Sequence, residues 1–458
     1  MSKLNITESN EIIKRLGEMI QEQDAREFNV RAIGLKLRTF LQTFTISVCF
    51  MKCITLEGLA LKCQQLQQGL SFTKQALFKR LKQGKEESKK LLESAVQLTM
   101  GQTVCSPKVA PVLEQFTSVL ITDATTLSLP DKLEVFHKGL GGTNAKSAMK
   151  IQATYDVKNK SFYKISQKDS ARENDAAYMS ELINEIKSGQ LIINDLGYYG
   201  VAHFLKISGI DAYFISKIKS NTNLYTEDNE PIDLYRKLRG KDFIDEAAVI
   251  KGEAGKQSMK VRLCGIRLPS NIYSKRLREA NKKAKASGKE LTKEERERLK
   301  WILLITNTTS EMLSCEAICE VYRIRWQIEI IFKSWKSHFS IDVMNNVGKD
   351  YWDCLLYGRL TIITMLTSMY SQLYHLVYHT TGRMVSFFRF MKNMRENLDI
   401  ISDYWNCYIS GEQVVLLLNS VVYASLIDVR KRKTTEQAIG DFHLNCDVID
   451  CVDDLVAC

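Results

Sequence analysis

Between residues 117 and 219 the chain alternates short β-branched apolar runs with amphipathic segments, and this order constrains the fold more than any other feature. The runs TSVLITDATTL, AMKIQATYDVKN and SFYKISQK have the alternation of strands in a meander. Helical spacing in DAAYMSELINEIKSG and VAHFLKIS then separates two further strands, in QLIINDLGYYG and AYFISKIKS. Three strands, helix, strand, helix, strand predict a mixed α/β sheet.

The regions on either side have other patterns. Residues 1–112 have helical spacing, and residues 221–300 combine a β segment, SMKVRLCGIRLP, with a lysine- and arginine-rich run. WILLITNTT returns to strand character, and a helix capped by Ser314 should follow it. We therefore expect five regions, which are residues 1–112, 113–220, 221–300, 301–352 and a mostly helical 353–458 that ends in an acidic tail.

A helix–turn–helix pattern lies inside the first region, in ITLEGLALKCQQLQQGLSFTKQALFKRLKQ. Gly69 is suited to end the first helix and Ser71 to cap the second. The polar side of the second helix carries Lys74, Gln75, Lys79, Arg80 and Lys82. This arrangement suits insertion into a DNA groove, and a solvated amphipathic helix pair is the alternative.

Bulk composition narrows the class of protein. The chain has 458 residues, a formal charge of +11 and a pI of about 8.9, which suggests two to four domains and a polyanionic partner. Its twelve cysteines include no CxxC pair, the pattern of reduced thiols in a cytosolic protein. The N-terminus is polar, and the apolar stretch LLYGRLTIITMLTSMY is interrupted by Arg359. We expect no membrane span and a cytoplasmic location.

Three acidic residues stand out by position. Asp123 and Asp195 each close an apolar run, and Glu329 lies on a helix that follows another strand. Carboxylates from separate elements at one sheet edge suit a two-metal site for phosphoryl transfer, with Mg²⁺ as the preferred ion. The chain has 53 acidic residues, so structural or incidental acids are the alternative.

The segment YRIRWQIEIIFKSWK places that glutamate among cations. At about 100° per residue, one narrow helix face would carry Tyr322, Arg325, Glu329 and Lys336. A second face would carry Ile324, Ile328, Ile331 and Trp335, and it should be buried.

In these residues the chain resembles the DDE transposases of bacterial insertion sequences, in the group with the YREK signature. That signature is Tyr, two residues, Arg, three residues, Glu, six residues, Lys, and Tyr322, Arg325, Glu329 and Lys336 match it in full. ITDATTL and INDLGYYG match the settings of the first and second acids, and residues 221–300 match a β-rich insertion. The resemblance implies an RNase H-like core with this insertion, flanked by helical regions.

The resemblance also implies an activity. Asp123, Asp195 and Glu329 would be catalytic and would bind two Mg²⁺ ions, for which Mn²⁺ would substitute. The chain would bind the terminal inverted repeats of its element and target DNA, as a homodimer in the synaptic complex. It would cleave strands and transfer them, with hairpin ends in some relatives, while associated with the nucleoid. An RNase H-like nuclease without strand transfer and a non-catalytic DNA-binding derivative are the alternatives.

Further DNA contacts follow from the same resemblance. Tyr322, Arg325 and Lys336 would hold the backbone beside the scissile phosphate. Trp301 and Trp326 match the tryptophans that hairpin-forming relatives use around a flipped base, and ordinary packing is the alternative.

Three further groups of residues, two of them basic and one in the tail, are less specific. Lys217 and Lys219 would contact the DNA backbone or protect an edge strand. The basic run from residue 274 to 300 would be a solvated helix or a phosphate contact. In the tail, the spacing of His443, Cys446, Cys451 and Cys458 does not match a zinc pattern, and we expect a disordered acidic segment there.

Overall fold

The computed structural model describes residues 14–15, 18, 35–50, 54–67, 71, 73–100, 111–141, 145–219, 222–252, 257–343 and 347–427. Its strands are β1 (Val119–Leu129), β2 (Ser147–Asp156), β3 (Ser161–Lys168), β4 (Leu191–Asn194), β5 (Tyr213–Lys217), β6 (Leu224–Tyr225), β7 (Phe243–Lys251), β8 (Ser258–Arg267) and β9 (Trp301–Thr306). The helices before and within the sheet are α2 (Leu37–Gln42), α3 (Val48–Phe50), α4 (Leu56–Leu66), α5 (Lys74–Met100), α6 (Asp175–Leu182), α7 (Val201–Gly209), α8 (Leu234–Leu238), α9 (Ser270–Ala286) and α10 (Lys293–Arg298). After β9 come α11 (Cys315–Arg323), the 3₁₀ turn η6 (Ile324–Trp326), α12 (Gln327–Phe339), α13 (Lys349–Thr381), α14 (Phe387–Glu396), α15 (Leu398–Trp405) and α16 (Gly411–Ser425).

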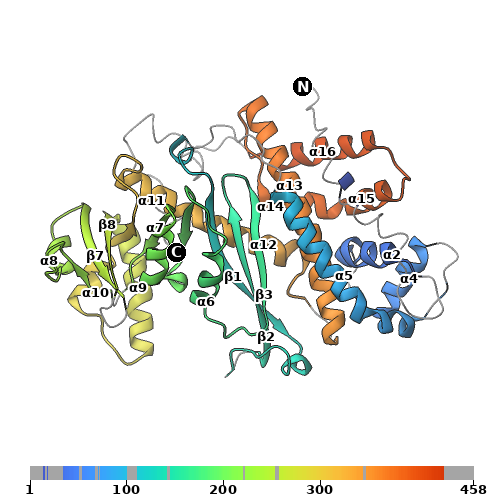
Figure 1. Cartoon of the computed structure of the whole chain (residues 1–458), viewed down its shortest axis with the longest axis horizontal. Helices are drawn as coiled ribbons and strands as arrows, with labels where there is room; N and C mark the ends of the chain where they lie inside the picture. The colour runs from blue at the N-terminus through green and yellow to red at the C-terminus, as the bar shows by residue number, and fades with distance from the viewer. Residues whose placement is uncertain are drawn as a thin grey trace.

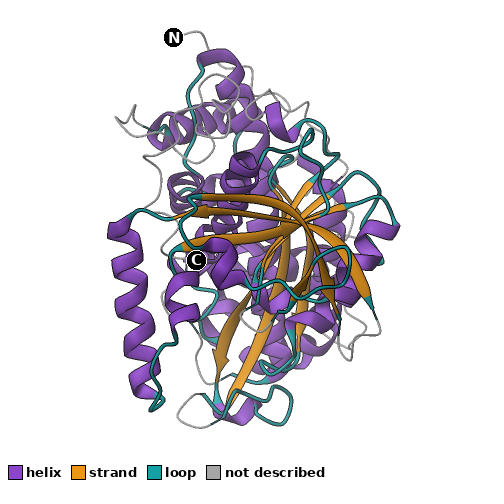
Figure 2. Ribbon diagram, turned by 90° about the vertical axis from the view of Figure 1, so that its left-hand side faces the viewer, coloured by secondary structure: helices purple, strands orange, loops and turns teal. Residues whose placement is uncertain are grey.

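A single mixed sheet forms the centre of the molecule, with the strand order β3-β2-β1-β4-β5-β9-β8-β7-β6 (Figures 1 and 2). The first three strands form the predicted antiparallel meander, and β4 and β5 run parallel to β1. With α6 and α7 as crossovers, this arrangement confirms the predicted α/β, RNase H-like fold class with flanking helical regions.

The β-rich insertion is continuous with the core sheet. β9 pairs antiparallel with β5 on one side and with β8 on the other, so β6 to β8 extend the sheet beyond β5. Figure 1 shows these strands with α8, α9 and α10 at the end of the molecule away from the N-terminal helices. In α9 only Ile272 is buried, so the basic run forms a largely solvated helix.

Two apolar layers cover the two faces of the sheet. Alternation in β4 sends Ile193 to the layer that includes α11, α12 and α13, and Ile192 to the layer that includes α6 and α7. The larger layer continues into the N-terminal helices, where α5 packs along α13 and Phe44 meets Tyr351 edge to face. The helical region before β1 therefore shares one core with the helices that follow β9.

Some expectations for these flanking regions need correction. Arg80 is buried rather than part of the polar side of α5, and its guanidinium donates to the carbonyl oxygen of Ala76 over 2.7 Å. Gly69 and the cysteine-containing acidic tail lie outside the described residues. Among the described residues, no helix combines the length and apolar character that a membrane crossing needs. The five region boundaries stay predictions.

Candidate active site

The first two acids lie side by side on neighbouring parallel strands. In the register of β1 and β4, Thr122 pairs with Asn194, so Asp123 on β1 follows one member of this pair and Asp195 follows the other. Asp195 follows the end of β4, as the sequence predicted. The expectation that Asp123 ends its strand is wrong, because pairing with β2 carries β1 on to Leu129. Asp123 instead occupies the point where β4 stops and leaves one side of β1 uncovered.

Glu329 reaches these acids from a helical segment that is interrupted. The predicted cap is confirmed, since the Ser314 hydroxyl accepts a hydrogen bond from the Ala317 amide at 3.2 Å. One continuous helix from Tyr322 to Lys336 is not what the structure shows, because the 3₁₀ turn η6 separates α11 from α12. A 3₁₀ turn advances about 120° per residue instead of about 100°, so the predicted single narrow face is broken after Tyr322.

Arg325 bridges two of the acids from the middle of this turn. Its guanidinium lies 2.8 Å from a carboxylate oxygen of Glu329 and 3.6 Å from one of Asp123. The arginine side chain is only 3% exposed, whereas those of Asp123 and Glu329 are 26% and 33% exposed. A buried cation therefore holds two partly open carboxylates toward a shared space.

Electrostatics also show that the three acids are neighbours. Burial, together with the smaller effect of the charges of Asp195 and Glu329, raises the pKa of Asp123 to about 6, although the Ala124 amide and Arg325 act to lower it. A carboxyl whose ionisation is disfavoured by two other carboxylates is a natural position for a bound cation.

Tyr322 packs the end of α11 against the end of β4. The ring is fully buried, its hydroxyl donates to the Asn194 carbonyl oxygen over 3.5 Å, and the Lys217 ammonium lies 5.5 Å from the ring centroid. Lys219 lies beyond β5 and donates to the Tyr199 carbonyl oxygen over 3.4 Å. β5 pairs on both sides, so protection of an edge strand does not explain these lysines. Lys336 is half-buried on α12.

The two tryptophans differ in exposure. Trp301 opens β9 and is 3% exposed, and it lines a cleft of about 470 Å³ together with Lys217, Arg276, Lys283 and Arg298. Trp326 is half-buried and lines a separate cavity of about 300 Å³ beside α12, with Tyr370 and Tyr374 among its other lining residues. The structure thus places Trp301 near the strands that carry the acids and Trp326 on another side of the segment.

Polar residues that the sequence did not single out form a network on β2, the strand paired with the one that carries the first acid. Asp175, at the start of α6, accepts hydrogen bonds from Lys150 at 2.9 Å and from Gln152 at 2.7 Å. Gln152 is cross-strand to Ala124, the neighbour of Asp123, and it also accepts a hydrogen bond from Tyr198. Only strand register reveals this network, since its members are separated in the sequence and form no motif.

The donor set fits divalent metal ions. Three carboxylates supply hard oxygen ligands, and burial together with the charges of Asp195 and Glu329 raises the pKa of Asp123. A tighter cluster of possible metal ligands lies elsewhere in the described part of the chain. It consists of Asp245, Cys264 and Cys315, whose ligand atoms all lie within 4.8 Å of one another. The three acids are neighbours, two of them joined through Arg325, but they are not among the ligand atoms that lie this close together.

Strand order, paired acids and a cation-flanked glutamate define the class of metal-dependent nucleotidyl transferases with an RNase H-like core. Residues 114–365, more than half of the chain, match the family model described as the transposase DDE domain. The chain therefore belongs to this family of insertion-sequence transposases. Members of the family generally use divalent metal ions.

Several curated proteins are similar to this chain. It is 26% identical over 380 residues to the transposase for insertion sequence element IS231F of Bacillus thuringiensis subsp. israelensis. The aligned region covers 78% of each chain. It is 30% identical over 276 residues to the transposase for element IS1151 of Clostridium perfringens, which covers 56% of this chain and 57% of the relative. Among solved structures, a piggyBac transposase synaptic complex with hairpin DNA aligns with a TM-score of 0.45 and 11% identity, over 94% of this chain and 85% of that one.

Proposed function

We propose that this transposase binds the ends of its own insertion sequence, cleaves DNA there with Asp123, Asp195 and Glu329 as metal ligands, and joins the freed 3′-hydroxyl to another strand. The observation that carries the proposal is the adjacent register of Asp123 and Asp195, with Glu329 held beside them by Arg325. Three convergent carboxylates are the donor set that phosphoryl transfer assisted by two metal ions requires. We infer that the ions are two Mg²⁺, with Mn²⁺ as a substitute.

The chain's own residues position the reaction. Bound divalent ions would activate the attacking oxygen and stabilise the leaving oxygen. Asp123 would be fixed by its hydrogen bond from the Ala124 amide, which is 2.7 Å long. Glu329 would be aimed by Arg325, whose fork can then turn toward a phosphate oxygen of the DNA. Tyr322 would keep both elements in register, because its hydroxyl meets the end of β4 directly before Asp195.

The cleft beside Trp301 is the proposed place for a displaced base. Arg276, Lys283 and Arg298 supply positive charge to its walls, and Lys217 connects it to the catalytic strands. Among the described residues, the buried indole N–H of Trp301 has no hydrogen-bond partner, so a polar group entering the cleft would satisfy it. Lys336 on α12 and Trp326 at the end of η6 would also contact the end DNA. Two copies of the chain would hold two ends in one synaptic complex.

Covalent joining of the cleaved DNA end to another DNA strand distinguishes a transposase from a nuclease with the same fold. The full chain would be incubated in Mg²⁺ with a labelled duplex bearing the inverted repeat from the DNA next to the gene, together with a plasmid target. We expect cleavage at the repeat and covalent transfer of the label to the plasmid. Cleavage without any joined product would favour the nuclease alternative, and binding without cleavage would favour the non-catalytic one.

Hairpin formation tests the cleft directly. Replacement of Trp301 by Ala would remove about 1–3 kcal/mol of base stacking, so hairpin yield from pre-nicked end DNA should fall roughly ten- to a hundredfold. First-strand nicking should continue, since it needs no displaced base. The matched control is Trp352→Ala or a milder Trp352→Phe, a buried tryptophan on α13 outside the cleft. If the wild-type chain forms no hairpin, the role of the cleft is excluded and the transposase function is not.

A further inference from the structure

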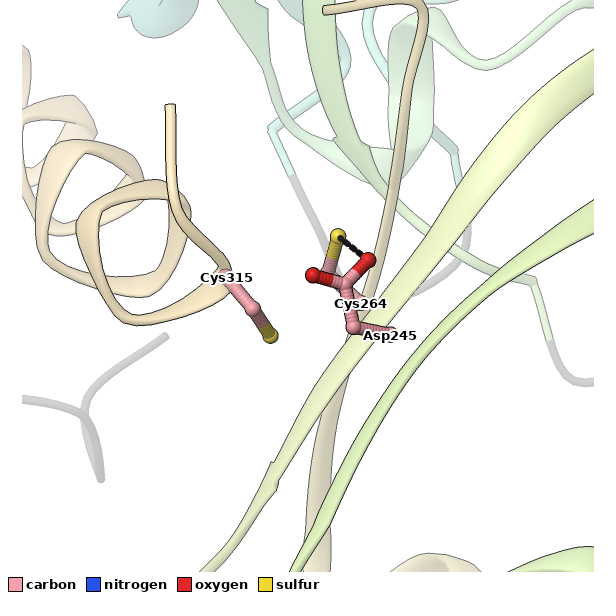
Figure 3. A group of neighbouring side chains, drawn as sticks. All are labelled: Asp245, Cys264 and Cys315. Carbon is pink, nitrogen blue, oxygen red and sulfur yellow. Dashed lines mark hydrogen bonds between the residues drawn. The ribbon is translucent and has the colours of Figure 1, made fainter. Parts of the chain in front are cut away.

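A cluster of two thiols and a carboxylate lies at the junction between the insertion strands and α11 (Figure 3). Asp245 on β7 and Cys264 on β8 are directly cross-strand partners, and the Cys264 thiol donates to the carboxylate over 3.7 Å. Cys315 is the first residue of α11, and its side chain points back toward the pair. The three ligand atoms all lie within 4.8 Å of one another.

A third thiol stands one helical turn away. Cys319 follows Cys315 by four residues on α11, so both side chains lie on the same helix face. The Cys315 thiol lies 3.5 Å from the carbonyl oxygen of Ile244 and 4.0 Å from that of Gly265, the strand neighbours of Asp245 and Cys264. All three cysteines are buried. The Cys264 and Cys315 sulfur atoms and a carboxylate oxygen of the partly exposed Asp245 therefore share one small region, and the buried Cys319 thiol lies one helical turn from it.

Spacing and charge suit a thiophilic cation. Tetrahedral zinc with metal–sulfur bonds of about 2.3 Å has neighbouring ligand atoms about 3.5–3.8 Å apart, which matches the separation of Cys264 and Asp245. The Arg262 guanidinium donates two hydrogen bonds to the Asp245 carboxylate, which are 2.5 and 2.6 Å long. It also donates to the Leu313 carbonyl oxygen over 2.6 Å. Such an outer contact fixes a ligand carboxylate and offsets the negative charge of several thiolates.

We propose that Asp245, Cys264 and Cys315, with Cys319 completing the set by a side-chain rotation, bind one structural zinc ion. The site is distinct from the three catalytic acids and does not depend on the proposed DNA chemistry. Its ligands come from β7, β8 and the first turns of α11, so the ion would fasten the insertion strands to the helix that ends one residue after Tyr322. Three thiols with a carboxylate favour coordination over a simple disulfide, which would use only two of them.

Cobalt is the probe for this site, because Co²⁺ bound tetrahedrally by thiolates absorbs strongly in the visible and near-ultraviolet. The full chain would be purified under reducing conditions, stripped with a chelator and titrated with Co²⁺. We expect one equivalent to produce these bands and one equivalent of Zn²⁺ to abolish them. Co²⁺ at the catalytic acids would bind through oxygen and would not produce the thiolate charge-transfer band.

Serine variants locate the site. Cys315→Ser should lose the thiolate bands yet fold, because serine is well tolerated at the start of a helix. Cys49→Ser is the matched control, since that buried helical thiol contacts a carbonyl oxygen over 3.5 Å, as Cys315 does. A chain with Cys446→Ser, Cys451→Ser and Cys458→Ser should keep the bands, which excludes the tail thiols.

The proposal is overturned if the wild-type chain shows no thiolate bands, if Cys315→Ser retains them at full strength, or if the tail variant loses them. It is also overturned if mass spectrometry finds Cys264 and Cys315 joined by a disulfide in chain that binds no metal. Should Cys315→Ser not fold, X-ray absorption at the zinc edge of the tail variant decides the matter. Two or three sulfur neighbours support the site, and oxygen and nitrogen neighbours alone contradict it.

Discussion

Asp123 is a residue whose chemistry opposes the stability of the fold. Its pKa of about 6 lies above the ordinary value of 3.8 because the side chain is largely buried and faces two other acids. A folded-state pKa above the unfolded one means that the folded chain binds the extra proton between these values. The stability that this group contributes is therefore greatest below pH 4 and is lost as the pH rises through 6.

Replacing this carboxyl by its neutral isostere should stabilise the metal-free chain. Asp123→Asn should raise the free energy of unfolding at pH 7.5 by up to about 3 kcal/mol, and the gain should vanish as the pH falls from 6 toward 4. Thermal unfolding of both chains in a chelating buffer at several pH values measures this. Asp228→Asn, in an exposed turn, is the control. A gain that is equal at pH 4 and pH 7.5 would contradict the account.

Arg325 has two acidic partners, and this should decide when it can contact DNA. In a chelating buffer its charge is engaged by Asp123 and Glu329, so Arg325→Gln should leave the salt dependence of end-DNA binding unchanged. In Ca²⁺ the proposed metal ligands should be engaged by the ion instead, and Arg325→Gln should then weaken the slope of log affinity against log salt by about 0.9. Binding titrations at several salt concentrations test this, with Arg236→Gln on the exposed side of α8 as the control. Equal slopes under both conditions would mean that Arg325 never reaches a phosphate.

At the scale of single elements, α13 depends on a glycine for its contact with the N-terminal helices. A Cβ atom at Gly358 would lie 1.8 Å from the carbonyl oxygen of Phe44, which is backbone and cannot rotate away. The helix axis of α13 can approach this backbone so closely only because Gly358 has no side chain.

Gly358→Ala should therefore separate the two segments and destabilise the fold by roughly 3 kcal/mol or more. Gly209→Ala is the matched control, since it ends α7 with nothing within 4 Å of the added atom and should be neutral or slightly stabilising. Chemical denaturation of both variants measures the difference. Similar unfolding midpoints for the two would show that this close approach does not contribute to stability.

Sequence periodicity predicted some of these elements and missed others. Local patterns located α7, β5 and the Ser314 cap, because alternation, helical spacing and a capping hydroxyl are properties of neighbouring residues. The continuation of β1 past Asp123 depends on pairing with β2, and the ion pair between Arg325 and Asp123 joins η6 to that strand. Such contacts join distant parts of the chain, and no window of sequence contains them.

At the scale of the whole molecule, the catalytic sheet and its helical flanks share one core. The YREK motif could identify Glu329, Arg325 and Tyr322 from sequence, but it could not show that Tyr322 is fully buried or that Arg325 pairs with the acids. Nor could it show that the insertion extends the sheet through β9, because that arrangement depends on which strand edges remain open.

This shared core determines how end recognition can be tested. α5 packs along α13, so the N-terminal helices should be examined in the full chain rather than as a fragment. Lys79 and Lys82 are exposed on α5, and reversing both to Glu should weaken binding to terminal-repeat DNA with a salt slope reduced by about 2. Lys89→Glu with Lys90→Glu, exposed later on α5, is the control. An equal loss for random duplex would make this helix a general phosphate contact.

The most direct test of the central claim compares wild-type chain with Asp123→Ala, Asp195→Ala and Glu329→Ala on one labelled end duplex in Mg²⁺. Each ligand loss should reduce cleavage at least about a thousandfold, because the metal ions supply several kcal/mol of transition-state stabilisation. Binding to the same duplex, followed by gel shift, should stay close to wild type, since phosphate contacts come from cationic residues. Cleavage at the wild-type rate by any one of the three variants would contradict the account.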